Sequence, residues 1–130
     1  MSAIALKANQ QVSPVNDYEP LMRTYVAGAT LTTGMAVQID GTTGRAIAAI
    51  AATTAAATLG IVIGPGATAG RPVVVLERGV VDGYNVAALN FGAQVFNGAA
   101  GVVDTAGTIP IGRVVSMSEL TPVKVVEIML

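Results

Sequence analysis

The chain of 130 residues contains neither cysteine nor histidine. The absence of cysteine excludes a disulfide framework and thiolate chemistry, and the absence of histidine removes the commonest general base and a frequent ligand of transition metals. Charged residues make up only 12% of the chain, about half the share of an average soluble domain. A monomer with so few charges would expose much apolar surface. The composition therefore indicates that part of the surface is covered by other chains.

Neither basic nor acidic residues are concentrated in any part of the chain. Seven basic and eight acidic residues give a net charge of −1, and no run of one sign occurs. Nucleic-acid binding needs a basic face, so we do not expect it. The uncharged stretch 46–63 is long enough for a membrane span, but it is rich in Ala and Thr and is followed by Gly64-Pro65-Gly66. We expect a loop and a strand there, and no membrane partner.

Runs rich in valine and isoleucine alternate with glycine-rich turns from about residue 22 onward, which is the pattern of an all-β domain. The expected strands lie near 22–27, 35–40, 44–50, 59–63, 72–78, 80–84, 93–97, 101–104, 110–116 and 122–129. Segment 51–58 is compatible with a strand, a loop or a short helix. Residues 1–21 lack glycine, have weak periodicity and contain Pro14 and Pro20. They predict an extended N-terminal arm, separate from a β-rich domain at 22–130.

The β-rich part contains two weakly similar units. Leu31–Val37 aligns with Leu89–Val95, and Gly-x-x-Gly turns follow at 41–44 and 98–101. Further on, the Leu-Gly-Ile-Val of 59–62 aligns with the Ile-Gly-Arg-Val of 111–114, and the apolar segment 72–77 aligns with 122–127. The common order predicts a pseudo-symmetric β-sandwich or small β-barrel of β-tulip type.

Three aspartates lie in predicted turns beside glycine or threonine: Asp40, Asp82 and Asp104. Carboxylates in loops can bind a metal ion, but aspartate also favours turns because its side chain bonds the local backbone. We predict the turn role. Gly64–Arg71 imitates a phosphate-binding loop, yet Pro72 stands where a metal-ligating Ser or Thr belongs. We predict no catalytic residue, no cofactor and no metal site, and no enzymatic activity.

Several glycine-punctuated segments between Tyr25 and Val115 resemble the capsid cement or head-decoration proteins of tailed bacteriophages. They are Leu31-x-x-Gly34-x-x-Val37, Leu59–Ile63, Ala69–Val75, Glu77–Val81, Phe91–Phe96 and Ile111–Val115. The resemblance implies a structural virion protein on the outer capsid surface, with a β-rich body that assembles as a homotrimer. It also implies an arm that orders on the major capsid protein. The chain departs from the family by its longer arm and its Ala/Thr-rich insertion at 46–58.

Apolar side chains along the arm are the expected capsid contacts, because an extended segment can add to a partner as a strand. These side chains are Ile4, Leu6, Val12, Val15 and Tyr18. They are the only binding residues that we predict.

Two alternatives fit the same composition. One is another virion component, such as a tail or fibre subunit. The other is a small β-clip-type ligand-binding module. A biotinyl or lipoyl carrier needs a lysine on a tight turn, and Lys7 and Lys124 lie in the arm and in a predicted strand. Sugar binding would have to use Tyr84-Asn85 and Asn90-Phe91.

Overall fold

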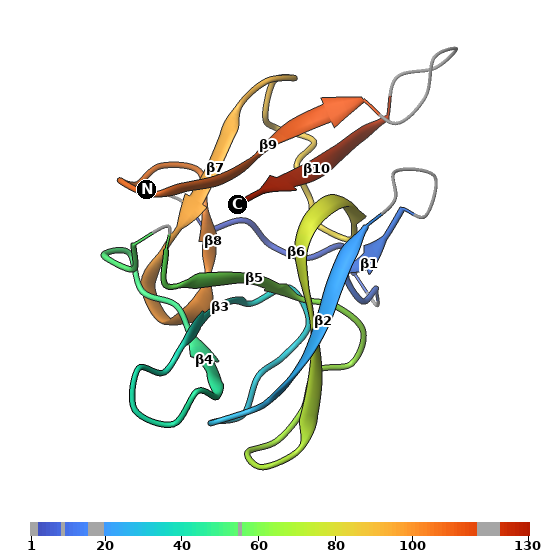
Figure 1. Ribbon diagram of the computed structural model, residues 1–130. Coiled ribbons are helices and arrows are strands. Elements are labelled where there is room, and N and C mark those ends of the chain that lie inside the picture. The colour runs from blue at the N-terminus through green and yellow to red at the C-terminus, as the bar shows by residue number, and fades with distance from the viewer. Residues whose placement is uncertain (1–2, 9, 16–19, 55, 117–122) are drawn as a thin grey trace.

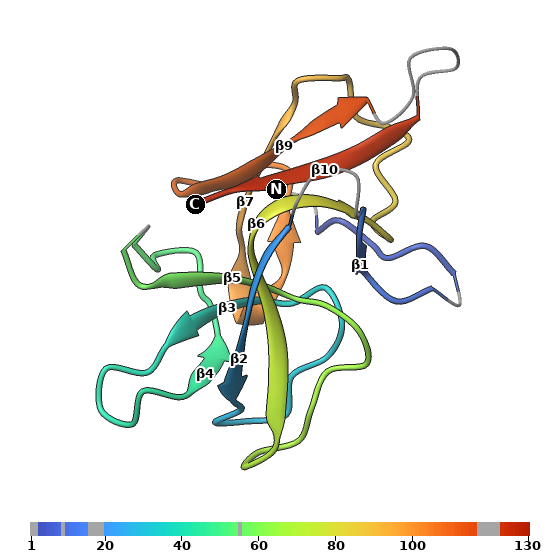
Figure 2. The ribbon, with the colours of Figure 1, turned by 45° about the vertical axis from the view of Figure 1, so that its right-hand side comes forward.

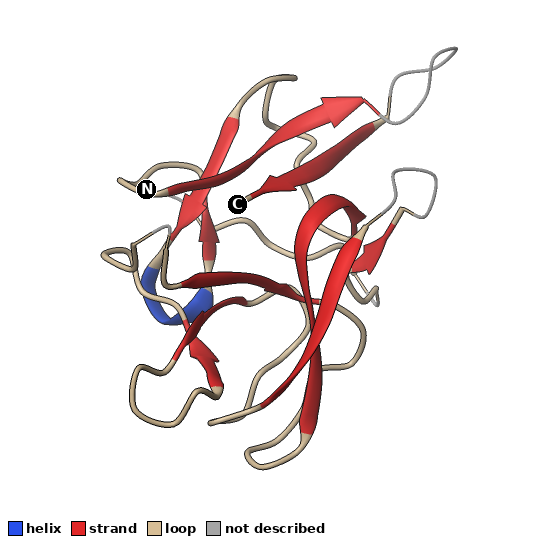
Figure 3. Ribbon diagram, viewed as in Figure 1, coloured by secondary structure: helices blue, strands red, loops and turns tan. Residues whose placement is uncertain are grey.

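The computed structural model describes residues 3–8, 10–15, 20–54, 56–116 and 123–130. These residues form one curled antiparallel sheet, and their one helical element is a single 3-10 turn (Figures 1 and 3). The all-β prediction and the small barrel or sandwich are thereby confirmed. The elements are β1 (Ser13–Pro14), β2 (Leu21–Val26), β3 (Ala36–Ile39), β4 (Ala46–Ala48), β5 (Thr58–Val62), β6 (Pro72–Asp82), β7 (Gln94–Asn97), η2 (Ala99–Gly101), β8 (Val103–Asp104), β9 (Pro110–Ser116) and β10 (Lys124–Met129).

The strand β6 is the centre of the sheet. The strand order is β4-β3-β5-β6-β10-β9-β7-β8, and β1 and β2 pair with β6 beside that path. The first half of β6 lies between β2 and β5, and its second half lies between β10 and β1. The sequence predicted two strands here, 72–78 and 80–84. They are one strand, because Gly79 does not form a turn but pairs with Ile128 of β10.

The two sequence units fold with the same strand register. In the first unit Val37 of β3 faces Gly60 of β5, and in the second unit Val95 of β7 faces Gly112 of β9. Each pair is followed by an irregularity in the register of β3 or β7. The internal repeat that the sequence predicted is therefore a repeat of backbone pairing.

The closing strands of the units correct one detail of the sequence alignment. Val62 faces Val75 in the first unit, and Val114 faces Val126 in the second. Val75 is therefore equivalent to Val126, whereas the sequence aligned it with Val125. Because residues 125 and 126 are both valine, the sequence alone did not show which of them is equivalent to Val75.

The repeat also extends further toward the N-terminus than the sequence indicated. Arg23 of β2 faces Val75, and Val81 in the second half of β6 faces Val126. Because Val75 and Val126 are equivalent, Arg23 and Val81 are equivalent too. The strand β2 therefore opens the first unit as the second half of β6 opens the second unit, and β6 both closes one unit and opens the other (Figures 1 and 2).

The two units are closed differently. In the first unit Ala27, at the end of β2, forms a bridge directly with Ala46 of β4. In the second unit the N-terminal segment lies between the equivalent strands. It accepts a hydrogen bond from Asn85 N and donates one to Val103 O, each 2.8 Å long.

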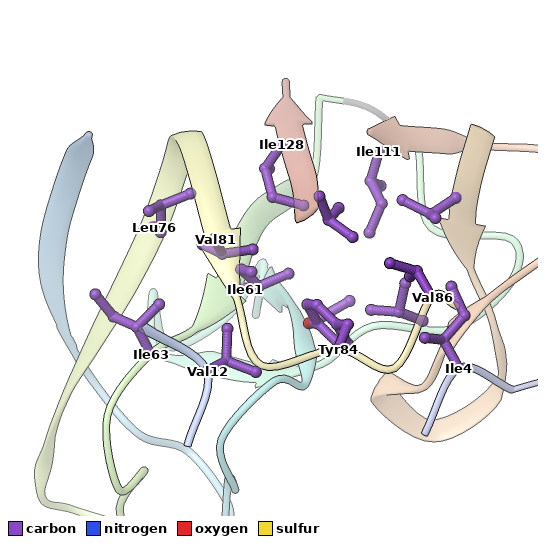
Figure 4. Packing of buried hydrophobic residues seen from close by; sticks show 14 of the residues in the cluster. Ile4, Val12, Ile61, Ile63, Leu76, Val81, Tyr84, Val86, Ile111 and Ile128 are labelled. Carbon is purple, nitrogen blue, oxygen red and sulfur yellow. The ribbon is translucent and has the colours of Figure 1, made fainter. Parts of the chain in front are cut away.

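Two hydrophobic clusters fill the fold. The smaller one lies within the first unit and includes Leu31, Val37, Val62, Val73 and Val75. The larger one contains residues of both units and of the N-terminal segment (Figure 4). Its labelled members are Ile4, Val12, Ile61, Ile63, Leu76, Val81, Tyr84, Val86, Ile111 and Ile128. The hydroxyl of the buried Tyr84 donates to Gly34 O, which ties the second unit to the first.

Gly60 and Gly112 hold equivalent places where a side chain cannot fit. A Cβ on Gly60 would overlap the carbonyl oxygen of Leu76, and one on Gly112 would overlap that of Glu127. Gly60 also has a φ of +146°, which L side chains rarely adopt. Both glycines therefore allow the central strands to approach each other.

We expect Gly60→Ala and Gly112→Ala each to lower the free energy of unfolding by about 2–3 kcal/mol, the cost of overpacking at a close backbone contact. Urea denaturation would measure it. Gly41→Ala is the matched control, because a Cβ there meets nothing within 4 Å. Equal stability of all three variants would contradict the assigned packing.

Candidate interaction surface

The side chains predicted to bind a capsid lie largely within the chain's own fold. Ile4 and Val12 are buried in the larger core cluster, and Leu6 and Val15 are half-buried. Tyr18 lies outside the described residues. Because Ile4 and Val12 are packed in the core, their side chains are not available to another protein in this conformation.

Backbone hydrogen bonds hold the N-terminal segment in place along its length. Lys7 N donates to Gly83 O at 2.7 Å, and Val15 N donates to Val80 O at 2.8 Å. Near the middle of the segment, Val12 O accepts a hydrogen bond from Gly64 N at 3.0 Å. The segment is extended, as predicted, but it folds against both units. Its deletion would remove part of the core, so it would test folding rather than capsid binding.

One ion pair reinforces this attachment. Lys7 Nζ lies 2.7 Å from Asp82 Oδ1, and Gly83 N donates to the same oxygen at 2.8 Å. Partial burial opposes ionisation of the carboxyl, but the hydrogen bonds from Lys7 and Gly83 outweigh it. They hold the pKa of Asp82 below its ordinary value.

The other two turn aspartates bond the local backbone, as the sequence predicted. Asp40 accepts hydrogen bonds from Thr42 N and from the Thr43 hydroxyl, each at 3.0 Å, and these hold its pKa below the ordinary value. Asp104 accepts one from Ala106 N at 3.1 Å. In the described part of the chain, no three acidic side chains gather into a group that could hold a metal ion.

The residues considered for sugar binding are only partly brought together. Asn85 and Phe91 line a hollow of about 400 Å³ with Lys7 and Lys124. However, Lys124 Nζ lies 5.5 Å from the centre of the Phe91 ring and covers its face. Tyr84 is buried, with its hydroxyl bonded inside the fold. Of the two aromatic rings considered for sugar binding, only that of Phe91 is exposed, at 49%.

An exposed apolar face lies over β2 and the first half of β6. It consists of Met22, Thr24, Val26, Pro72 and Val74, and we call it the β2–β6 face. Met22, Val26 and Val74 are 41%, 44% and 40% exposed. No member carries a charge, so the face is suited to contact with another protein.

The charged side chains of the same strands are engaged apart from this face. Arg23 Nε lies 3.4 Å from Glu77 Oε2, and the Tyr25 hydroxyl donates to Glu77 Oε1 at 3.0 Å. The β2–β6 face was not predicted from the sequence, because all the predicted binding residues lie in the arm. The signal was present: alternate residues of Leu21–Val26 separate an uncharged set from the set that carries Arg23.

The chain matches no protein-family model, no curated protein and no solved structure. None of the segments that the structure describes forms a helix able to span a membrane.

Asp82→Asn tests the attachment of the N-terminal segment. A carboxyl whose pKa is lowered by folding stabilises the protein above its unfolded pKa, about 3.9, and this stabilisation is lost as the pH falls through the folded value. The variant should be less stable near neutral pH by at most about 1 kcal/mol, because both partners are roughly a third exposed. The difference should disappear in acid.

Denaturation at pH 7 and at pH 3 measures the effect, with Lys7→Gln and the double variant as controls. We expect the double variant to be no less stable than either single one, because each single change already removes the pair. Additive losses, or a difference as large at pH 3 as at pH 7, would contradict this account of the ion pair.

Proposed function

We propose that this protein is a structural virion component that decorates the outer surface of a phage capsid and binds across subunits of the major capsid protein. The observation that carries the proposal is the β2–β6 face, an uncharged exposed sheet face in a chain with only 12% charged residues. The family resemblance of the glycine-punctuated segments supports the same function. The proposed contact is the sheet face and not the N-terminal segment, in which Ile4 and Val12 pack inside.

The strength of such a contact argues for several copies acting together. Burying what remains exposed of Met22, Val26 and Val74 contributes on the order of 1 kcal/mol each. A binding free energy of about 3 kcal/mol corresponds to a dissociation constant above about 1 mM. Copies joined to one another bind a repetitive shell by avidity. The proposal therefore includes a homo-oligomer, for which the resemblance implies three copies.

Density-gradient fractionation of the native source tests the proposal. We expect mass spectrometry to detect this chain in the fractions of capsid-sized particles, at an abundance close to that of the major capsid protein. Its presence only at the top of the gradient would overturn the decoration function. Its presence in tail or fibre fractions would favour the other virion component.

Val74→Asp tests the contact itself, on capsids stripped of this protein and then mixed with purified variants. A carboxylate on the β2–β6 face would have to be desolvated, so we expect binding to weaken at least about tenfold. Thr108→Asp is the matched control, because Thr108 is exposed in a loop outside the face. Equal binding of both variants would exclude the β2–β6 face as the capsid contact.

A further inference from the structure

One asparagine of the chain is followed by glycine. The chain has five asparagines, and only Asn97 precedes a glycine, Gly98. Asparagine is a thermally labile residue, because the backbone nitrogen of the next residue can attack its side-chain carbon Cγ. Glycine has no Cβ to hinder that approach and leaves the backbone free to make it. The sequence therefore contains one position at which a side-chain amide is readily lost.

The reaction needs only the chain and water. Gly98 N bonds to Cγ of Asn97, the bond between Cγ and Nδ2 breaks, and Nδ2 leaves as ammonia with the proton that Gly98 N gives up. One water molecule then opens the cyclic imide. Opening at Cγ gives aspartate, and opening at the main-chain carbonyl carbon gives isoaspartate, in which the chain continues through Cγ.

The fold holds both reacting groups in hydrogen bonds away from solvent. Asn97 ends β7 and is 0% exposed, and its Nδ2 donates to the Thr58 hydroxyl at 3.0 Å. Gly98 is also buried, and its N donates to Val102 O at 2.8 Å. In the cyclic imide Gly98 N carries no hydrogen, so this bond would have to break. Removal of a proton from a buried, bonded N–H requires the structure to open.

The strand β8 and the turn before it fill the space beside Gly98. A Cβ on Gly98 would lie 2.9 Å from Val102 O and 3.1 Å from Cβ of Asp104. On the other side of the same peptide, Asn97 pairs with β8 and its N donates to Ile109 O at 3.1 Å. The peptide between Asn97 and Gly98 is thus held from both sides, and cyclisation requires β7 and β8 to separate.

We infer that Asn97 is a modification site that the fold closes, and that its modified forms fold less stably. The site suits a neutral amide. Among the described residues nothing donates a hydrogen bond to Asn97 Oδ1, and the Thr58 hydroxyl beside it donates to Thr54 O. A carboxylate there would be buried without a donor, and Asp104, 7% exposed beside Gly98, would add a second negative charge. Burial of an unpaired charge is costly.

Isoaspartate is equally unsuited to this place. It adds one atom to the backbone between Asn97 and Gly98, where the hydrogen bonds to Ile109 O and Val102 O are two residues or fewer apart in the chain. Both products therefore oppose refolding, and loss of the amide removes chains that stay unfolded from the pool that can fold. This inference does not depend on the proposed capsid function, because it concerns the single chain.

Rates of amide loss test the closure of the site. Chains folded in buffer and chains unfolded in guanidinium chloride are kept at mildly alkaline pH and digested with trypsin, which releases residues 79–113 as one peptide with Asn85, Asn90 and Asn97. By mass spectrometry we expect the amide of Asn97 to be lost at least about tenfold faster in the unfolded chain. Asn85 and Asn90 precede bulkier residues and should keep their amides.

Equal rates in the folded and unfolded chains would overturn the inference, as would loss at Asn85 or Asn90 as fast as at Asn97. Gly112→Ala adds a test in buffer, because Gly112 lies in β9 opposite Val95 of β7. This variant should lose the Asn97 amide at least about tenfold faster than the unmodified chain, since more of it is open at any time. Gly41→Ala should keep the unmodified rate. The unmodified rate in both variants would contradict closure by folding.

Asn97→Asp tests the fate of the product. We expect its equilibrium constant of unfolding in urea to be at least about tenfold larger than that of the unmodified chain. Asn90→Asp makes the same chemical change at an exposed residue and should be as stable as the unmodified chain. Equal stability of the two variants would overturn the inference that the modified chain folds less stably.

Discussion

The strand β6 has to satisfy two different sets of neighbours along its 11 residues, and the rest of the sheet is arranged around this requirement. Its first half closes the first unit against β5, and its second half opens the second unit against β10. A strand shared in this way cannot shift its register in one unit without shifting it in the other. The close backbone contacts at Gly60 and Gly112, one in each unit, fix the neighbouring strands around it.

The two units share β6, and each unit has an equivalent strand edge. The N-terminal segment covers only one of these two edges. The chain has one such segment and two equivalent edges. In the second unit the segment covers the edge, buries Ile4 and Val12 and pairs Lys7 with Asp82. In the first unit β4 closes the end of this edge at Ala27, and no strand among the described residues covers it at Met22 and Thr24. The apolar exposure of β2 is therefore a consequence of the repeat, and not an isolated surface feature.

Most of the fold followed from short-range patterns in the sequence. Valine-rich runs separated by glycine-rich turns located most of the strands, and the recurring Leu-x-x-Gly-x-x-Val segment revealed the repeat. The single strand β6 was missed because Gly79 resembles a turn when its pairing with Ile128 is unknown. The helical alternative for 51–58 was not realised, since the described residues of that segment form turns and the start of β5.

The interaction surface was harder to predict, because it depends on which strands lie at an edge. The position of Ile4 and Val12 in a proline-containing terminal segment predicts docking residues, but apolar side chains in such a segment can equally pack on their own chain. The segment that folds inward covers one of the two equivalent edges, and Met22 and Val26 at the other edge remain exposed. Strand pairing, a long-range property, thus decides which apolar residues become core and which become interface.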